Sequence, residues 1–96
     1  MNNLPVKTRQ ELELEKESVL AQKRTNLITR ITTDMHYQIV YAYTNNEGDC
    51  NRVFDIAGLT DVIQPIIDNL RSAFPDFNIS SNSIENSPMI SFIAEW

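Results

Sequence analysis

The longest regular pattern in the chain covers residues 27–44. Apolar and aromatic side chains recur at its odd positions, whereas polar side chains fill most of its even positions. Successive side chains of a strand point to opposite faces, so this two-residue period is typical of a half-buried strand. We therefore predict one long strand over residues 27–44, with Tyr37, Tyr41 and Tyr43 on its core face.

A turn is expected at residues 45–49, where Gly48 can adopt a positive φ. Residues 50–57 then return antiparallel to the long strand. The register that sets apolar side chains opposite one another pairs Tyr41 with Phe54, Ile39 with Ile56 and Tyr43 with Arg52. The first part of the long strand extends beyond this partner, so we expect the C-terminal strand to pair with it.

A polar helix is predicted before the long strand. Thr8 is followed three residues later by Glu11, which is a capping box, and the helix reaches about Arg24. Residues 11–15 also alternate and would suit a strand, but the helix-forming residues around them favour a helix. The apolar stripe of this helix is narrow and consists of Leu12, Val19 and Leu20. A helix this polar either lies loosely on the domain or packs against another molecule.

A second helix is predicted from a single wide apolar face. Thr60 or Asp61 caps it, Pro65 lies within its first turns, and Pro75 ends it after Phe74. The face consists of Ile63, Ile66, Ile67, Leu70 and Phe74, which follow the helical repeat.

The last part of the chain predicts a hairpin. Residues 77–84 are rich in Ser and Asn, which suits an exposed edge strand, and residues 86–88 form a turn. Residues 89–96 return with Ile90, Phe92, Ala94 and Trp96 on one side. The expected fold is α+β in the order α-β-β-α-β-β, with a four-stranded antiparallel sheet of strand order 2-1-4-3 and the second helix across one face.

The composition fits one small folded domain over residues 1–96, of which residues 1–6 are expected to be frayed. Hydrophobic residues make up 42% of the chain and charged residues 22%, as in ordinary globular proteins. No apolar run is long enough to span a bilayer and no signal peptide is evident, so we expect a cytoplasmic protein that binds no membrane. The single cysteine agrees with a reducing compartment.

Residues that could support catalysis are few. His36 and Asp34 lie on one face of the predicted strand and could form a carboxylate-oriented base, but no nucleophile or anion-stabilising group accompanies them. Cys50 could be a nucleophile, although the predicted register places it far from His36. One Cys and one His exclude an ordinary zinc site, residues 45–49 are too short for a calcium loop, and two glycines make no phosphate loop. We expect no enzyme activity, cofactor or metal.

Charge is distributed unevenly along the chain. Residues 1–30 contain six Lys and Arg against four Glu, whereas residues 31–96 contain two Arg against nine acids. The acidic body favours a basic partner and works against direct nucleic-acid binding. It also argues against using the three tyrosines as a base-stacking platform, so we interpret them as core residues. The candidate partner-binding residues are Asp34, Glu47, Asp49, Asp55, Asp61 and Asp68.

Two functions agree with these features. The first is a non-catalytic protein-binding module, an inhibitor or antagonist that docks an acidic surface on a basic protein such as a nuclease or another nucleic-acid-handling protein. Bacterial immunity proteins and phage anti-defence proteins provide a class analogy for such a small acidic accessory protein, without shared motifs. The second is a structural or assembly subunit, a homodimer for example, that self-associates through its N-terminal helix or its edge strands.

Overall fold

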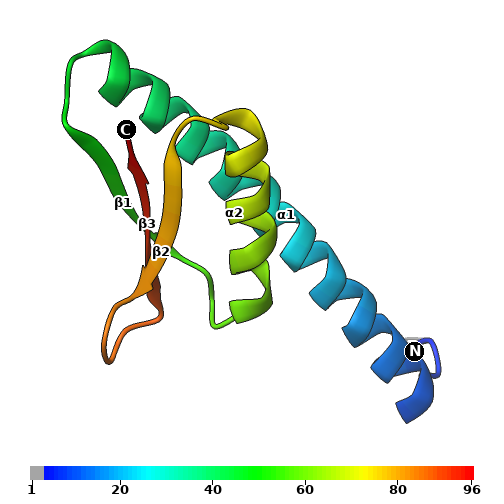
Figure 1. Cartoon of the computed structure of the whole chain (residues 1–96). Helices are drawn as coiled ribbons and strands as arrows, with labels where there is room; N and C mark the ends of the chain where they lie inside the picture. The colour runs from blue at the N-terminus through cyan, green and yellow to red at the C-terminus, as the bar shows by residue number, and fades with distance from the viewer. Residues whose placement is uncertain (1–3) are drawn as a thin grey trace.

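The largest element of the computed structural model is a helix of 36 residues, α1 (Arg9–Thr44) (Figure 1). The structure describes residues 4–96. The lead-in expected at residues 1–6 lies partly outside that range, and residues 4–8 form no regular element before the helix. The Thr8 side chain accepts a hydrogen bond from the backbone N–H of Glu11 at 3.1 Å, so the threonine half of the predicted capping box is confirmed.

The predicted strand over residues 27–44 is wrong, because these residues form the second half of α1. The buried side chains in it are Ile31, Met35, Ile39 and Ala42, which lie one turn apart on a single helical face. A spacing of four residues keeps odd positions odd, so three of these side chains also fit a two-residue period. No Gly or Pro occurs between Pro5 and Gly48, and a helix that begins at Thr8 therefore meets no residue that would end it near Arg24.

The sheet has three antiparallel strands in the described residues: β1 (Asp49–Asp55), β2 (Asn78–Ser83) and β3 (Met89–Glu95). Their order is β1-β3-β2, so the predicted four-stranded sheet of order 2-1-4-3 is wrong and residues 4–96 contain no fourth strand. The predicted hairpin register is also wrong, because β1 pairs with β3 and sets Phe54 opposite Ile90 and Arg52 opposite Phe92. The pairing of the last two strands is confirmed, and β2 lies at an edge as expected.

The turns between elements use residues other than those expected. After α1, Asn46 takes the left-handed conformation with φ 61°, and Gly48 does not. A short 3-10 turn, η1 (Thr60–Val62), leads into α2 (Ile63–Ala73), and neither Thr60 nor Asp61 caps it with a side-chain hydrogen bond. The apolar face of α2 is confirmed, since Ile66, Ile67 and Leu70 are buried.

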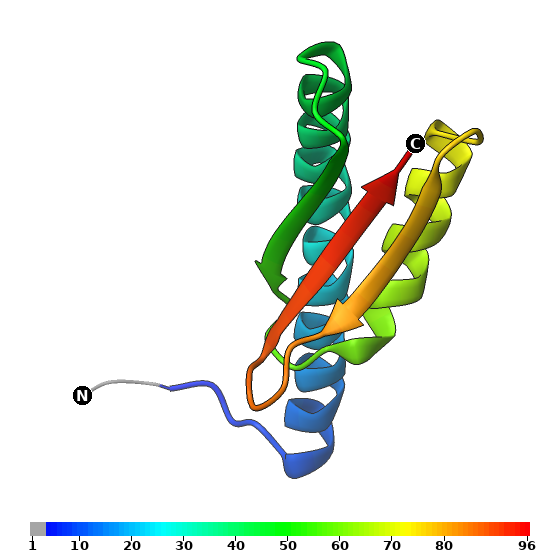
Figure 2. The same ribbon diagram turned by 60° about the vertical axis from the view of Figure 1, so that its left-hand side comes forward.

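The elements form two layers. The second half of α1 and all of α2 lie side by side on one face of the sheet (Figure 2). Between the layers lies one core to which every element contributes, with Phe92 of the central strand as its largest fully buried side chain. The opposite face of the sheet is not covered by any element of residues 4–96.

The first half of α1 extends beyond the two layers (Figures 1 and 2). Every residue from 9 to 19 is exposed, including Leu12 and Val19, which retain about half of their accessible surface. The molecule is consequently elongated and measures 65 × 27 × 23 Å. We call residues 9–19 the projecting segment.

Candidate functional site

The pair that could have formed a catalytic base is separated by the helix. Asp34 and His36 lie two residues apart in α1, which turns their side chains about 200° from one another. The His36 ring instead packs near Phe74 of the α2 end, with 4.8 Å between ring centroids. The predicted common face of Asp34 and His36 is therefore wrong.

Cys50 is fully buried in β1, opposite Ala94 of the central strand. Burial raises the pKa of its thiol, against a smaller lowering by the Arg52 charge. A buried thiol of raised pKa is mostly protonated at neutral pH and is a poor nucleophile. Within residues 4–96, no group of three His, Cys, Asp or Glu side chains is placed to hold a metal ion.

The tyrosines expected in the core are exposed instead. Tyr37, Tyr41 and Tyr43 retain 66%, 50% and 53% of their accessible surface on α1. Tyr43 joins an aromatic cluster with Phe77 and Trp96, with centroid separations of 5.3 to 5.4 Å. The Trp96 indole donates a hydrogen bond to the Glu47 carbonyl at 3.0 Å, which fixes this end of the molecule.

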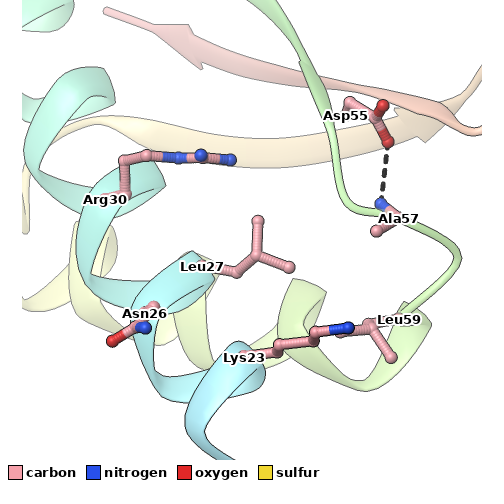
Figure 3. Close-up of a pocket in the computed structure, with 7 residues that line it drawn as sticks. All are labelled: Lys23, Asn26, Leu27, Arg30, Asp55, Ala57 and Leu59. Atoms are coloured by element: carbon pink, nitrogen blue, oxygen red, sulfur yellow. Dashed lines mark hydrogen bonds between the residues drawn. The ribbon is translucent and has the colours of Figure 1, made fainter. Parts of the chain in front are cut away.

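A groove of about 400 Å³ lies between α1 and the segment that follows β1 (Figure 3). The helix contributes Lys23, Asn26, Leu27 and Arg30 to its lining, and the opposite wall consists of Asp55, Ala57 and Leu59. In Figure 3 the Leu27 side chain lies between those of Arg30 and Lys23, so two cationic side chains flank an apolar one along this wall. Neither Lys23 nor Arg30 forms an ion pair in the part of the chain that the structure describes.

The groove wall opposite α1 includes a tight turn at residues 55–58. The Asp55 carboxylate accepts a hydrogen bond from the Ala57 backbone N–H at 2.8 Å, and Ala57 and Gly58 both have positive φ angles, 54° and 74°. A non-glycine residue with positive φ costs free energy, which the carboxylate contact offsets in part. Next to this turn Asp61 pairs with Arg24 at 2.6 Å, which ties η1 to the helix.

The two basic residues of the groove belong to a longer row along α1. Arg9, Lys16, Lys23 and Arg30 follow one another at intervals of seven residues. Seven residues are nearly two helical turns, so the four side chains share one face and are about 10.5 Å apart along the axis. We call these four residues the basic row.

The six acidic residues predicted to bind a partner do not form one patch. Asp34 lies on α1, four residues after Arg30, and Asp55 lies in the groove wall. Glu47 and Asp49 lie at the turn into β1. Asp61 is paired with Arg24, and Asp68 lies on the exposed side of α2, where it accepts a hydrogen bond from Gln64. Their role in binding stays a prediction, and the structure distributes them over α1, the two ends of β1, η1 and α2.

A second acidic surface lies on the uncovered face of the sheet. Asp49 is directly opposite Glu95 of the central strand, and both side chains are exposed. Beside them Ser91 donates a hydrogen bond to Asn51, and Val53 retains 47% of its accessible surface. We call the outward side chains of β1 and β3 the open face: Asp49, Asn51, Val53, Asp55, Met89, Ser91, Ile93 and Glu95.

Sequence reasoning missed the groove and the basic row. Lys23 lies in the predicted helix and Arg30 in the predicted strand, so the break expected after Arg24 hid their common face. The seven-residue interval between like charges was the signal that could have revealed it. It also missed Arg52, whose guanidinium donates to the Gln38 side chain at 3.2 Å and joins β1 to α1.

Comparisons with protein-family models, with curated proteins and with solved structures find no significant match to this chain. No helix of the described residues is both long enough and apolar enough to cross a membrane.

Proposed function

We propose that this chain is a non-catalytic protein-binding module that docks its open face on a basic protein surface. The observation that supports it is a sheet face that no element of residues 4–96 covers and that combines apolar side chains with carboxylates. Val53 and Ile93 supply apolar area at its centre, and Asp49, Asp55 and Glu95 supply charge around them.

The charges at one end of the open face favour a cationic partner. Like charges directly opposite one another on neighbouring strands destabilise a sheet. Asp49 and Glu95 are such a pair, so a Lys or Arg of a partner would relieve their repulsion while it gained two carboxylate contacts. Proteins that handle nucleic acid present basic surfaces, and an antagonist that covered one would act by occupying it.

The test is affinity capture from the native host with two charge-matched variants. Asp49→Asn/Glu95→Gln removes two charges from the open face, whereas Asp68→Asn/Glu85→Gln removes two charges from exposed positions elsewhere. We expect the first variant to lose the partner and the second to keep it. Equal capture by both variants would overturn the open face as the docking surface.

The association rate provides an independent measurement once a partner is identified. Electrostatic steering predicts a rate that falls at least tenfold between low and high salt, because screening shortens the reach of the open-face charges. A rate that does not change with salt would contradict the role of charge. A His36→Ala/Cys50→Ala variant is expected to bind as the wild type does.

A second candidate function is self-assembly, and the projecting segment favours it. Leu12, Leu14 and Val19 are exposed there, and no other element of residues 4–96 covers this part of α1. Sedimentation equilibrium up to several hundred micromolar tests this candidate. We expect a dimer, and a monomer at every concentration would exclude it.

A further inference from the structure

One side of α1 changes its charge along the helix. Leu12, Val19 and the basic row occupy its first part on the side that borders the groove. Asp34 follows Leu27 by seven residues, Tyr37 follows Arg30 by seven, and Tyr41 follows Asp34 by seven, so these three continue the same side. This side, which we call the groove side of α1, is therefore basic in its first part and acidic and aromatic in its second.

The intervals between the basic residues that precede Lys23 match the intervals between the acidic and aromatic residues that follow Asp34. Lys16 precedes Lys23 by seven residues, and Tyr41 follows Asp34 by seven. Arg9 precedes Lys23 by fourteen, and Glu47 follows Asp34 by thirteen. A helix laid antiparallel on a copy of itself can therefore bring Lys23 opposite Asp34, Lys16 opposite Tyr41 and Arg9 next to Glu47, whereas Arg30 falls opposite Leu27.

We propose that two copies of this chain pair through the groove sides of α1, antiparallel and about a twofold axis near residues 28 and 29. Lys23 of each copy faces Asp34 of the other, Lys16 lies on the Tyr41 ring, and Arg9 reaches the turn at Glu47. This inference deepens the self-assembly candidate, because it names the face, the orientation and the register of the pairing.

The apolar side chains support the same arrangement. In this register Leu20 of one copy meets Tyr37 of the other, and Leu12 and Val19 cover exposed surface on the second half of the partner helix. Tyr37 and Tyr41 are otherwise unusually exposed for side chains of their size. The pairing uses the same surface on both copies, so it closes at a dimer.

Other occupants match fewer of these features. An anionic membrane or a nucleic acid would neutralise the basic row, but it would be repelled by Asp34, Glu47 and Asp55 and would leave the two tyrosines uncovered. A second copy supplies the acids, the rings and the correct spacing at once. Arg30 lies near the twofold axis, and Asp55 lines the same groove.

Disulfide formation between two single-cysteine variants tests the register. In the proposed dimer, Lys16→Cys of one copy lies beside Tyr41→Cys of the other, while the two copies of position 16 are separated by 25 residues, or roughly 37 Å along the helix. A disulfide needs Cα atoms within roughly 7 Å. Under mild oxidation we expect the mixture to form a covalent heterodimer and neither variant to cross-link alone. The wild type is the control for the buried Cys50.

Charge exchange tests the central contact. Lys23→Asp and Asp34→Lys should each weaken the dimer at least tenfold in sedimentation equilibrium, and an equimolar mixture should recover at least half of the wild-type association. Glu85→Lys, which makes the same charge change as Asp34→Lys at an exposed position outside α1, controls for net charge.

The outcomes distinguish failure of self-assembly from failure of the antiparallel register alone. A wild-type monomer at several hundred micromolar overturns both self-assembly and this register. A dimer that fails to cross-link as a mixture, or that cross-links through Lys16→Cys alone, overturns the antiparallel register and leaves self-assembly standing. A monomer that binds duplex DNA or phosphatidylserine vesicles through Lys16 and Lys23 assigns the basic row to a polyanion and also overturns the dimer.

Discussion

Ala42 is the residue that best distinguishes the strand predicted for residues 27–44 from the helix that these residues form. A strand would have placed it on the solvent face with the other even positions, whereas α1 places it in the core with no accessible surface. Tyr37 shows the reverse, since a strand would have buried it and the helix leaves it exposed. Single substitutions at these two positions therefore report which backbone the chain adopts.

We expect Ala42→Asp to destabilise the fold by about 3 kcal/mol or more, because it buries a charge without a partner. Ala21→Asp, at an exposed position of the same helix, should cost about 0.7 kcal/mol from helix propensity. Tyr37→Ser should stay within about 0.5 kcal/mol of the wild type. Urea unfolding followed by Trp96 fluorescence measures all three. A tolerant Ala42 together with a sensitive Tyr37 would contradict the helix.

The raised pKa of Cys50 predicts the direction of a pH effect. The unfolded thiol loses its proton near pH 9.0, whereas the folded thiol retains it to higher pH, so this contribution to stability is full below pH 9.0 and is lost as the pH rises through the folded pKa. We expect the free energy of unfolding to fall as the pH rises above 9.0, by up to about 1.4 kcal/mol per pH unit from this group. The pH dependence of Cys50→Ala is subtracted from that of the wild type, which removes the contribution of the other titrating groups. Equal pH dependence in the two proteins would contradict a stabilising role of the protonated Cys50 thiol.

Among the elements, α2 and the final hairpin could be predicted because their local signals agree. In α2 the apolar face recurs at helical spacing and Pro75 ends it, and in the hairpin Ile90, Phe92 and Ala94 alternate with more exposed positions. The second half of α1 could not be predicted, since its four-residue stripe fits both periods and its Ile, Thr and Tyr residues prefer strands. The continuous helix is favoured by packing against α2 and β1, which local propensity does not contain.

The same ambiguity limits what could be predicted of the candidate site. The acidic residues of the body were identified by composition alone, and their division between the open face, the groove and α2 required the fold. The basic row could be predicted from the sequence only if the helix was continued past Arg24. Predicting it therefore depends on one assignment, helix or strand, for residues 27–44.

Proline substitutions test the division of α1 into a supported and an unsupported half. At low micromolar concentration, Ser18→Pro should remove helical circular dichroism from the first ten residues of α1 and leave the urea midpoint unchanged, because residues 9–19 contact no other element. Thr33→Pro, also at an exposed position, should cost about 3 kcal/mol or more, because it breaks the half that packs on the sheet. Equal destabilisation by both would contradict the division.

At the scale of the whole molecule, an acidic two-layer body carries a helix with a basic side. The projecting segment is the least supported part of the helices in residues 4–96, and it should open by local unfolding far more often than the core does. Trypsin therefore should cleave first at Lys7, Arg9 and Lys16, well before Arg52, which is half-buried in the sheet and bonded to Gln38. Mass spectrometry of a limited digest identifies the order of cleavage. Early cleavage at Arg52 would contradict this ranking.

The unbroken backbone of α1 has a geometric consequence for both proposed surfaces. With no Gly or Pro between residues 9 and 44, the helix has no hinge, and its second half is fixed to the sheet by the core. Any molecule that holds the first turns therefore sets the direction in which the bare side of the sheet points. A pair of chains joined in this way would present two such sides at a constant angle. A partner with two matching patches could bind both only if its patches had the same relative orientation.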